Sequence, residues 1–120
     1  MAASAAIFVG FGTPIPGREA KANQVFSEAV QEYTRLQQQG EIESFEAALL
    51  EPHGGDLGGF ILIRGEREKL DRIRASAEFI RLNTRGQTVV HNLGVVNAFI
   101  GEQLNRQFAS YESDIADLVS

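Results

Sequence analysis

The chain has 120 residues, a net charge of −5 and no cysteine. Its length allows one domain with a real core, and its apolar and charged contents are those of a folded globular protein. The acidic charge argues against nucleic acid as a partner, and the lack of cysteine excludes disulfides, thiolate metal sites and a cysteine nucleophile.

The first predicted strand spans residues 7–11 and is apolar on both faces, which is typical of a central strand. Pro14 and Pro16 end it, because proline cannot continue a strand ladder. A helix is predicted over residues 19–36, with Gly40 as its cap. The apolar residues of this helix fall on one stripe, at Ala22, Phe26, Ala29, Tyr33 and Leu36.

Two further strands are predicted over residues 42–50 and 60–64, joined by a glycine-rich hairpin turn. Side chains alternate between the two faces of a strand. Ile61 and Ile63 are purely apolar, so we assign them to the face that the helices cover, together with Phe45, Ala47 and Leu49. Glu46 and Arg64 then share the opposite face.

The second half of the chain is predicted to form a helix over residues 66–82 and a strand over residues 95–100. A bend is expected near Ser76, followed by a second helical piece that ends at Asn92 with Gly94 as its cap. Alternatively, residues 88–93 belong to the last strand, since Val89 and Val90 favour strands. The tail, residues 102–120, is predicted to be helical and to dock on its own subunit or on a partner. Its apolar residues at helical steps are Leu104, Phe108, Tyr111 and Ile115.

The order of these elements predicts one α+β domain over residues 1–120, with an open antiparallel sheet and both helices on one face. The other sheet face would expose apolar side chains, namely Phe8, Leu50, Phe60, Leu62 and Phe99. A contiguous apolar patch on a monomer usually marks an interface, so we expect a homodimer. We also expect each subunit to keep a pocket between its sheet and its helices.

These segments resemble the ferredoxin-like βαββαβ fold in its dimeric α/β-barrel version. The resemblance covers residues 7–100 and rests on element order, on the sequences GEIESF at 40–45 and GGF at 58–60, and on segment 76–93. The superfamily includes cofactor-independent monooxygenases of the antibiotic-biosynthesis type, muconolactone isomerases, haem proteins, stress-responsive proteins and ligand-sensing domains. The resemblance therefore implies a dimer more than a particular reaction.

A polar trio is the first candidate site. Glu46 and Arg64 lie on one face of adjacent predicted strands, and Asn97 joins them if Val96, Ala98 and Ile100 point to the helices. Arg64 would hold a carboxylate or enolate oxygen, and Glu46 would act as a base if burial raised its pKa. If a ligand binds there, Arg64→Ala is expected to abolish the thermal shift that the ligand causes. The alternative is a cross-strand ion pair at the subunit interface.

The two histidines are the other candidates, because imidazole transfers protons near neutral pH. His53 is expected to be exposed in the hairpin turn. His91 is expected either at the cavity mouth, with a catalytic role, or at a helix end beside carbonyl groups. No grouping of histidines and carboxylates has metal-ligand spacing, so we expect no metal and no cofactor. A haem held by His91 is the open alternative, although this chain is much shorter than the haem-binding relatives.

Two functional hypotheses follow. The first is a homodimer that binds a small organic molecule, as a cofactor-independent monooxygenase or an isomerase-like enzyme. Its apolar walls would be Phe8, Phe60, Phe79 and Phe99, with Arg64, Asn97 and His91 supplying polarity. The second is a non-catalytic dimer for interaction or ligand carriage. Residues 1–6 lack the features of a signal peptide, and no segment approaches the ~20 apolar residues of a membrane span. We therefore expect a cytoplasmic protein with no membrane partner.

Overall fold

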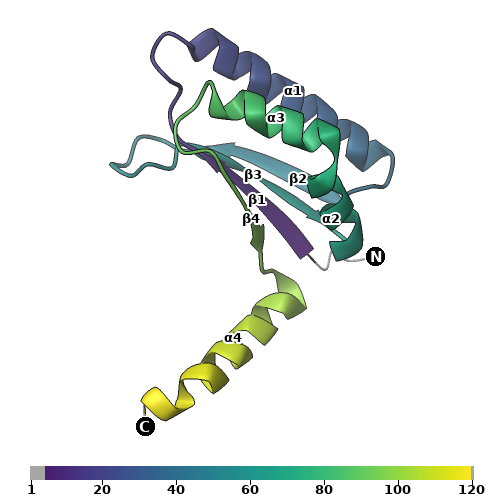
Figure 1. Ribbon diagram of the computed structural model, residues 1–120, viewed down its shortest axis with the longest axis vertical. Helices are drawn as coiled ribbons and strands as arrows, with labels where there is room; N and C mark the ends of the chain where they lie inside the picture. Colours follow the sequence, from purple (N-terminus) through teal and green to yellow (C-terminus); the bar gives the residue numbers. More distant parts are fainter. Residues whose placement is uncertain (1–4, 120) are drawn as a thin grey trace.

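The computed structural model describes residues 5–119, where a four-stranded sheet carries helices on one face (Figure 1). The elements are β1 (Ala5–Phe11), α1 (Glu19–Gln38), β2 (Ser44–Leu49), β3 (Gly59–Gly65), α2 (Arg67–Ala75), α3 (Ala77–Gln87), β4 (Gly94–Ala98), α4 (Gly101–Ile115) and the 3-10 turn η1 (Ala116–Leu118). The strand order is β2-β3-β1-β4, and every neighbouring pair is antiparallel. The predicted α+β, ferredoxin-like class is therefore confirmed.

The core lies between the sheet and the three helices α1, α2 and α3. Ile7 of β1 and Ile63 of β3 are opposite each other in the register, and both are fully buried. Tyr33 of α1 packs its ring against Phe45 of β2, with the centroids 5.9 Å apart. Leu70 of α2 is also fully buried. The prediction that Ile61, Ile63 and Phe45 face the helices is thus confirmed.

The other sheet face, which we call the outer face, carries the alternate residues of each strand. The register aligns Glu46, Leu62, Phe8 and Val96 across the four strands. Phe8 and Phe60 stack on this face with their ring centroids 5.4 Å apart. Leu50 was expected here, but it lines a cavity on the helix side instead. None of the helices α1–α3 covers the outer face (Figure 1).

The break between α2 and α3 falls at Ser76, as the sequence predicts. The Ser76 hydroxyl donates to the carbonyl of Ile73 at 2.6 Å and accepts from the backbone N–H of Phe79 at 3.3 Å. One side chain therefore ends the first helix and begins the second.

The prediction for residues 88–93 is wrong in both of its forms. α3 ends at Gln87, and Val90 forms only an isolated bridge to Pro14. The backbone of this segment pairs with the loop after β1: Ile15 N–H donates to Val89 at 2.9 Å, and Gly12 N–H donates to His91 at 2.7 Å. Asn92 has a φ of 56°. A continued helix would have used these carbonyls internally, so the loop contacts compete successfully with it.

Among residues 5–119, no helix has the length and apolar character needed to cross a bilayer. Most of residues 1–6, on which the expectation about a signal peptide depends, lie outside the described residues.

Candidate functional site

A cavity of about 460 Å³ lies between the sheet and the pair α1 and α3, at the end of the sheet that carries the hairpin turn. Its floor comes from β1 and β3, and its roof from the two helices. The apolar lining includes Val9, Phe11, Ala22, Phe26, Ala29, Ile61 and Leu82. Alanines at positions 22 and 29 and Gly86 of α3 present little side chain to the sheet, so the helix stripe leaves space there.

The mouth of the cavity is marked by the exposed members of its lining. Residues 50–57 of the hairpin turn are exposed, and so are Thr13, Pro14 and Asn23 around the start of α1. A small molecule would therefore enter between the hairpin turn and the start of α1. The pocket that the sequence predicts between sheet and helices is present.

Few polar groups line the deeper part of this cavity. Tyr33 is 2% exposed, and its burial raises the pKa of the hydroxyl well above its ordinary value of 10. The phenol is therefore a neutral hydrogen-bond donor at any physiological pH. Asn83 of α3 donates its Nδ2 to the carbonyl of Phe79 at 2.8 Å, which leaves Oδ1 as an acceptor beside the cavity.

His53 shapes the hairpin turn at the mouth. Its Nδ1 accepts from the N–H of Gly55 at 3.2 Å, and its Nε2 lies 2.7 Å from the carbonyl of Leu57. These two partners select the tautomer with the proton on Nε2. The ring is exposed, as expected, and both of its nitrogens are used to close the turn.

Glu46 and Arg64 lie outside this cavity, on the outer face. Arg64 Nη1 and Glu46 Oε1 are 2.7 Å apart, and the two side chains are 35% and 57% exposed. This is the cross-strand ion pair that the sequence left as an alternative. At such exposure the pair contributes little stability.

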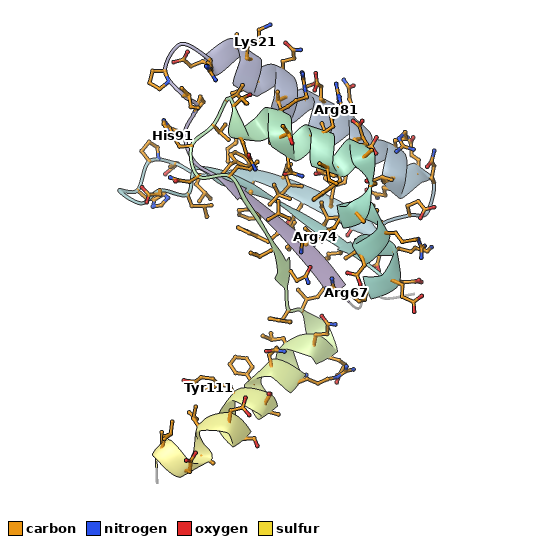
Figure 2. The ribbon with its side chains drawn as sticks, in the orientation of Figure 1. Lys21, Arg67, Arg74, Arg81, His91 and Tyr111 are labelled. Carbon is orange, nitrogen blue, oxygen red and sulfur yellow. The ribbon has the colours of Figure 1, made fainter. Side chains whose placement is uncertain are left out.

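Asn97 does not join that pair, because the register places it opposite Ile7 and so on the helix face of the sheet. Its Oδ1 accepts from Nη1 of Arg67 and from Nη1 of Arg74, each at 3.1 Å. Both arginines belong to α2 and lie beside the end of β4 (Figure 2). The condition for the trio, that Val96 and Ala98 face the helices, is not met.

The remaining predicted site residues are also dispersed. His91 is exposed, and its backbone pairs with the loop after β1 (Figure 2). Phe79 is buried in the core, Phe8 and Phe60 stack on the outer face, and Phe99 is 49% exposed. Sequence reasoning missed Asn83 and Tyr33 as cavity residues. The signal for Asn83 was a polar residue four positions after Phe79, inside an apolar series.

Within residues 5–119, no three histidine or carboxylate side chains gather closely enough to hold a metal ion. The two polar residues in the deeper part of the cavity, Tyr33 and Asn83, are a hydrogen-bond donor and an acceptor.

Neither a family model nor a curated protein sequence matches this chain. Several solved structures share its fold. A dimeric ferredoxin-like protein of unknown function from Bacteroides fragilis is 9% identical, with a TM-score of 0.55, over 83% of this chain and 100% of the other. SnoaB, a cofactor-independent oxygenase from Streptomyces nogalater, is 19% identical, with a TM-score of 0.50, over 82% and 97%. A candidate antibiotic biosynthesis monooxygenase from Chloroflexus aurantiacus is 12% identical, with a TM-score of 0.53, over 82% and 94%.

These structures confirm the resemblance to dimeric ferredoxin-like proteins, among them members of the antibiotic-biosynthesis-monooxygenase type. At such low identities the likeness concerns the fold. Each match covers 94% or more of the other chain and 82–83% of this one.

Proposed function

We propose that this protein is a homodimer that binds a small, largely apolar molecule in the cavity between its sheet and helices α1 and α3. The observation that carries this proposal is the cavity itself. Its volume of about 460 Å³ falls within the range of small-molecule sites, and apolar walls with a few polar groups are typical of them. Tyr33 would donate one hydrogen bond to the ligand, and Asn83 would accept one.

The dimeric part of the proposal is supported by the outer face. Phe8, Phe60, Leu62 and Val96 form an apolar surface without a covering layer in the single chain. The Bacteroides fragilis protein with the same fold is a dimer. Burial of this surface against a second copy removes it from water, which is the main driving force of association.

Binding is tested with the neutral fluorophore N-phenyl-1-naphthylamine, whose emission rises in apolar surroundings. The native chain is expected to bind it saturably, at one molecule per chain. Ala29→Leu places a larger side chain in the cavity and is expected to weaken binding at least about tenfold, the effect of roughly 1.4 kcal/mol. Ala20→Leu makes the same change on the exposed side of α1 and should leave binding unchanged.

Absence of saturable binding by the native chain would contradict the proposal. So would equal binding by the native chain and a folded Ala29→Leu variant.

A second candidate is catalysis of the cofactor-independent oxygenase kind, which the fold likeness to SnoaB favours. Such an enzyme lets the carbanion of its substrate reduce oxygen, so the site must mainly orient the substrate and accept a proton. Arg64 and Glu46 would take part only if a space between two facing sheets held the substrate, and His91 only from its exposed place beside Val90. Oxygen uptake with a polycyclic aromatic ketone that has an acidic C–H separates the candidates. If the native chain is a catalyst, it consumes oxygen faster than the Ala29→Leu variant does. If it is a carrier, it binds the ketone and consumes no oxygen.

A further inference from the structure

Helix α4 and the turn η1 form an arm that extends away from the domain. Figure 1 shows the arm leaving the end of β4 on the side opposite α1 and α3. None of the 15 residues of α4 is buried. The radius of gyration is 16.4 Å, whereas a compact chain of this length has about 14 Å. The arm therefore buries little of its surface against its own domain.

The arm is nevertheless strongly amphipathic. One side carries a stripe of apolar residues spaced by four, three and four positions, namely Leu104, Phe108, Tyr111 and Ile115. Phe108 is 60% exposed and Tyr111 is 63% exposed. The opposite side carries Arg106, Ala109 and Ser113. Two large aromatic side chains in water indicate a surface that is covered when the protein is assembled.

The stripe continues the apolar outer face of the sheet. Figure 2 shows Tyr111 projecting into the open angle between α4 and that face. The sheet alone is small: four strands about 4.8 Å apart and about 20 Å long give a footprint of roughly 400 Å². A standard interface buries about 800 Å² per partner. A helix of this length adds roughly 200 Å², so the arm brings the surface much closer to the standard size.

We infer that a second copy of the chain occupies this angle, so that the stripe of each α4 packs on the other chain. This inference rests on the homodimer of the proposed function and specifies how it is held. A two-fold pairing is self-complementary, because the arm of one chain covers the other and is covered in return. Both apolar surfaces that need cover are present on every chain.

Charge also favours a second copy. The arm has one basic residue, Arg106, against four acidic ones, which are Glu102, Glu112, Asp114 and Asp117. The domain presents Arg67 and Arg74 beside the end of β4, where both donate to the uncharged Asn97; Arg67 also pairs with Asp71 at 3.3 Å, whereas no ion pair is found for Arg74 within residues 5–119. An acidic arm near a basic rim of the partner speeds and orients association.

Sedimentation equilibrium of full-length variants tests the inference. Phe108→Asp with Tyr111→Asp places two carboxylates in the stripe and is expected to raise the dimer dissociation constant at least about a hundredfold, as loss of two buried aromatic anchors does. Ala109→Asp with Ser113→Asp adds the same charge to the opposite side of the same helix. That control is expected to change the constant less than about threefold, as surface charges do. Urea unfolding at dilution checks that both variants keep the native domain.

The outcomes separate the arm from the dimer. A native chain that stays a 13.1 kDa monomer at high micromolar concentration overturns both. A native dimer that the stripe variant leaves intact, or that both variants weaken equally, overturns the role of the arm alone and leaves the homodimer standing. Neither result bears on fluorophore binding in the cavity, which has its own test.

Photo-crosslinking gives a second measurement. With p-benzoylphenylalanine in place of Tyr111, irradiation is expected to produce a covalent dimer whose crosslinked peptide comes from the other chain. Crosslinks confined to the same chain would contradict the inference.

Discussion

Helices α1 and α4 have nearly the same sequence pattern, but the apolar stripe of α1 is covered by the sheet and that of α4 is exposed. Both carry apolar residues at steps of three and four, with an aromatic pair in each stripe, Phe26 and Tyr33 in one and Phe108 and Tyr111 in the other. Tyr33 is 2% exposed, whereas Tyr111 is 63% exposed. Periodicity therefore identifies the face of a helix that needs cover, and says nothing about what covers it.

The connections explain the difference. α1 links β1 to β2, which lie in one sheet on either side of β3, so the chain must cross back over the sheet and the stripe lands on it. α4 follows the edge strand β4 and has no later strand to reach among the described residues. The connection therefore does not draw the stripe of α4 back over the sheet.

The largest expected difference between the two helices is in their leucines. Leu36→Ala in α1 removes a buried side chain and is expected to cost about 2–5 kcal/mol of the free energy of unfolding. Leu104→Ala in α4 removes a side chain that is 42% exposed, and it should cost no more than about 0.5 kcal/mol in a monomeric sample. Urea unfolding at low micromolar concentration measures both.

Concentration then sharpens this comparison. If the arm packs on a second copy, the cost of Leu104→Ala increases when the chain is concentrated enough to dimerise, while that of Leu36→Ala does not. Equal costs for the two substitutions at dilution would show that α4 packs within its own chain.

A smaller loss of stability is expected from a substitution at the start of α3, the helix that packs beside α1. Ser76 begins α3 by accepting from the N–H of Phe79, and its replacement by alanine should cost about 1 kcal/mol. Ser113→Ala in α4 is the matched control, since that serine lies in the last turn of its helix with an exposed side chain, and its replacement should have almost no effect. Thermal unfolding followed by circular dichroism is suitable. An unchanged Ser76→Ala variant would mean that the break between α2 and α3 depends on packing and not on the cap.

The order of elements and the faces of the central strands were predictable because both depend on local patterns. The β-strand period of two assigned Ile61 and Ile63 to the core, and the bend at Ser76 followed from a change in the apolar series. Asn97 could not be placed, because a single-residue difference in register moves a side chain to the other face of the sheet. In β4 the purely apolar face, with Val96 and Ala98, is the outer one, and Asn97 lies on the helix side, so the rule that apolar residues face the helices gives the wrong face for this strand.

The candidate site was less predictable than the fold, for a related reason. A cavity forms where small residues from separate segments lie close together in space, here Ala22, Ala29 and Gly86. No local sequence pattern predicts which of them will be neighbours. Glu46, Arg64 and His91 stand out in the sequence because they are polar residues outside the apolar series; Glu46 and His91 are exposed, and Arg64 is half-buried. Asn83 and Tyr33 were inconspicuous because they belong to helical series that read as core.

The smallest expected effect is a pH-dependent change in stability, and it compares a carboxylate of α1 with one of α4. Arg85 of α3 donates from Nε and Nη2 to the two carboxylate oxygens of Glu28 in α1, at 3.0 and 2.9 Å. This hydrogen bond from Arg85 lowers the pKa of Glu28 below its ordinary value of 4.5, against an opposing contribution from desolvation. A lowered pKa in the folded state means that the ionised form stabilises the fold above the unfolded-state value, and that this stability is lost as the pH falls through the folded-state pKa.

Glu28→Gln should therefore be less stable than the native chain at neutral pH, and the gap should close as the pH falls below about 4.5. Glu112→Gln in α4 removes a carboxylate for which no ion pair is found within residues 5–119, so it should show no such pH-dependent gap. Urea unfolding of the three chains between pH 3 and pH 7 makes the comparison. A gap for Glu28→Gln that persists at pH 3 would mean that the amide disturbs packing, and that the charged pair does not tie α1 to α3.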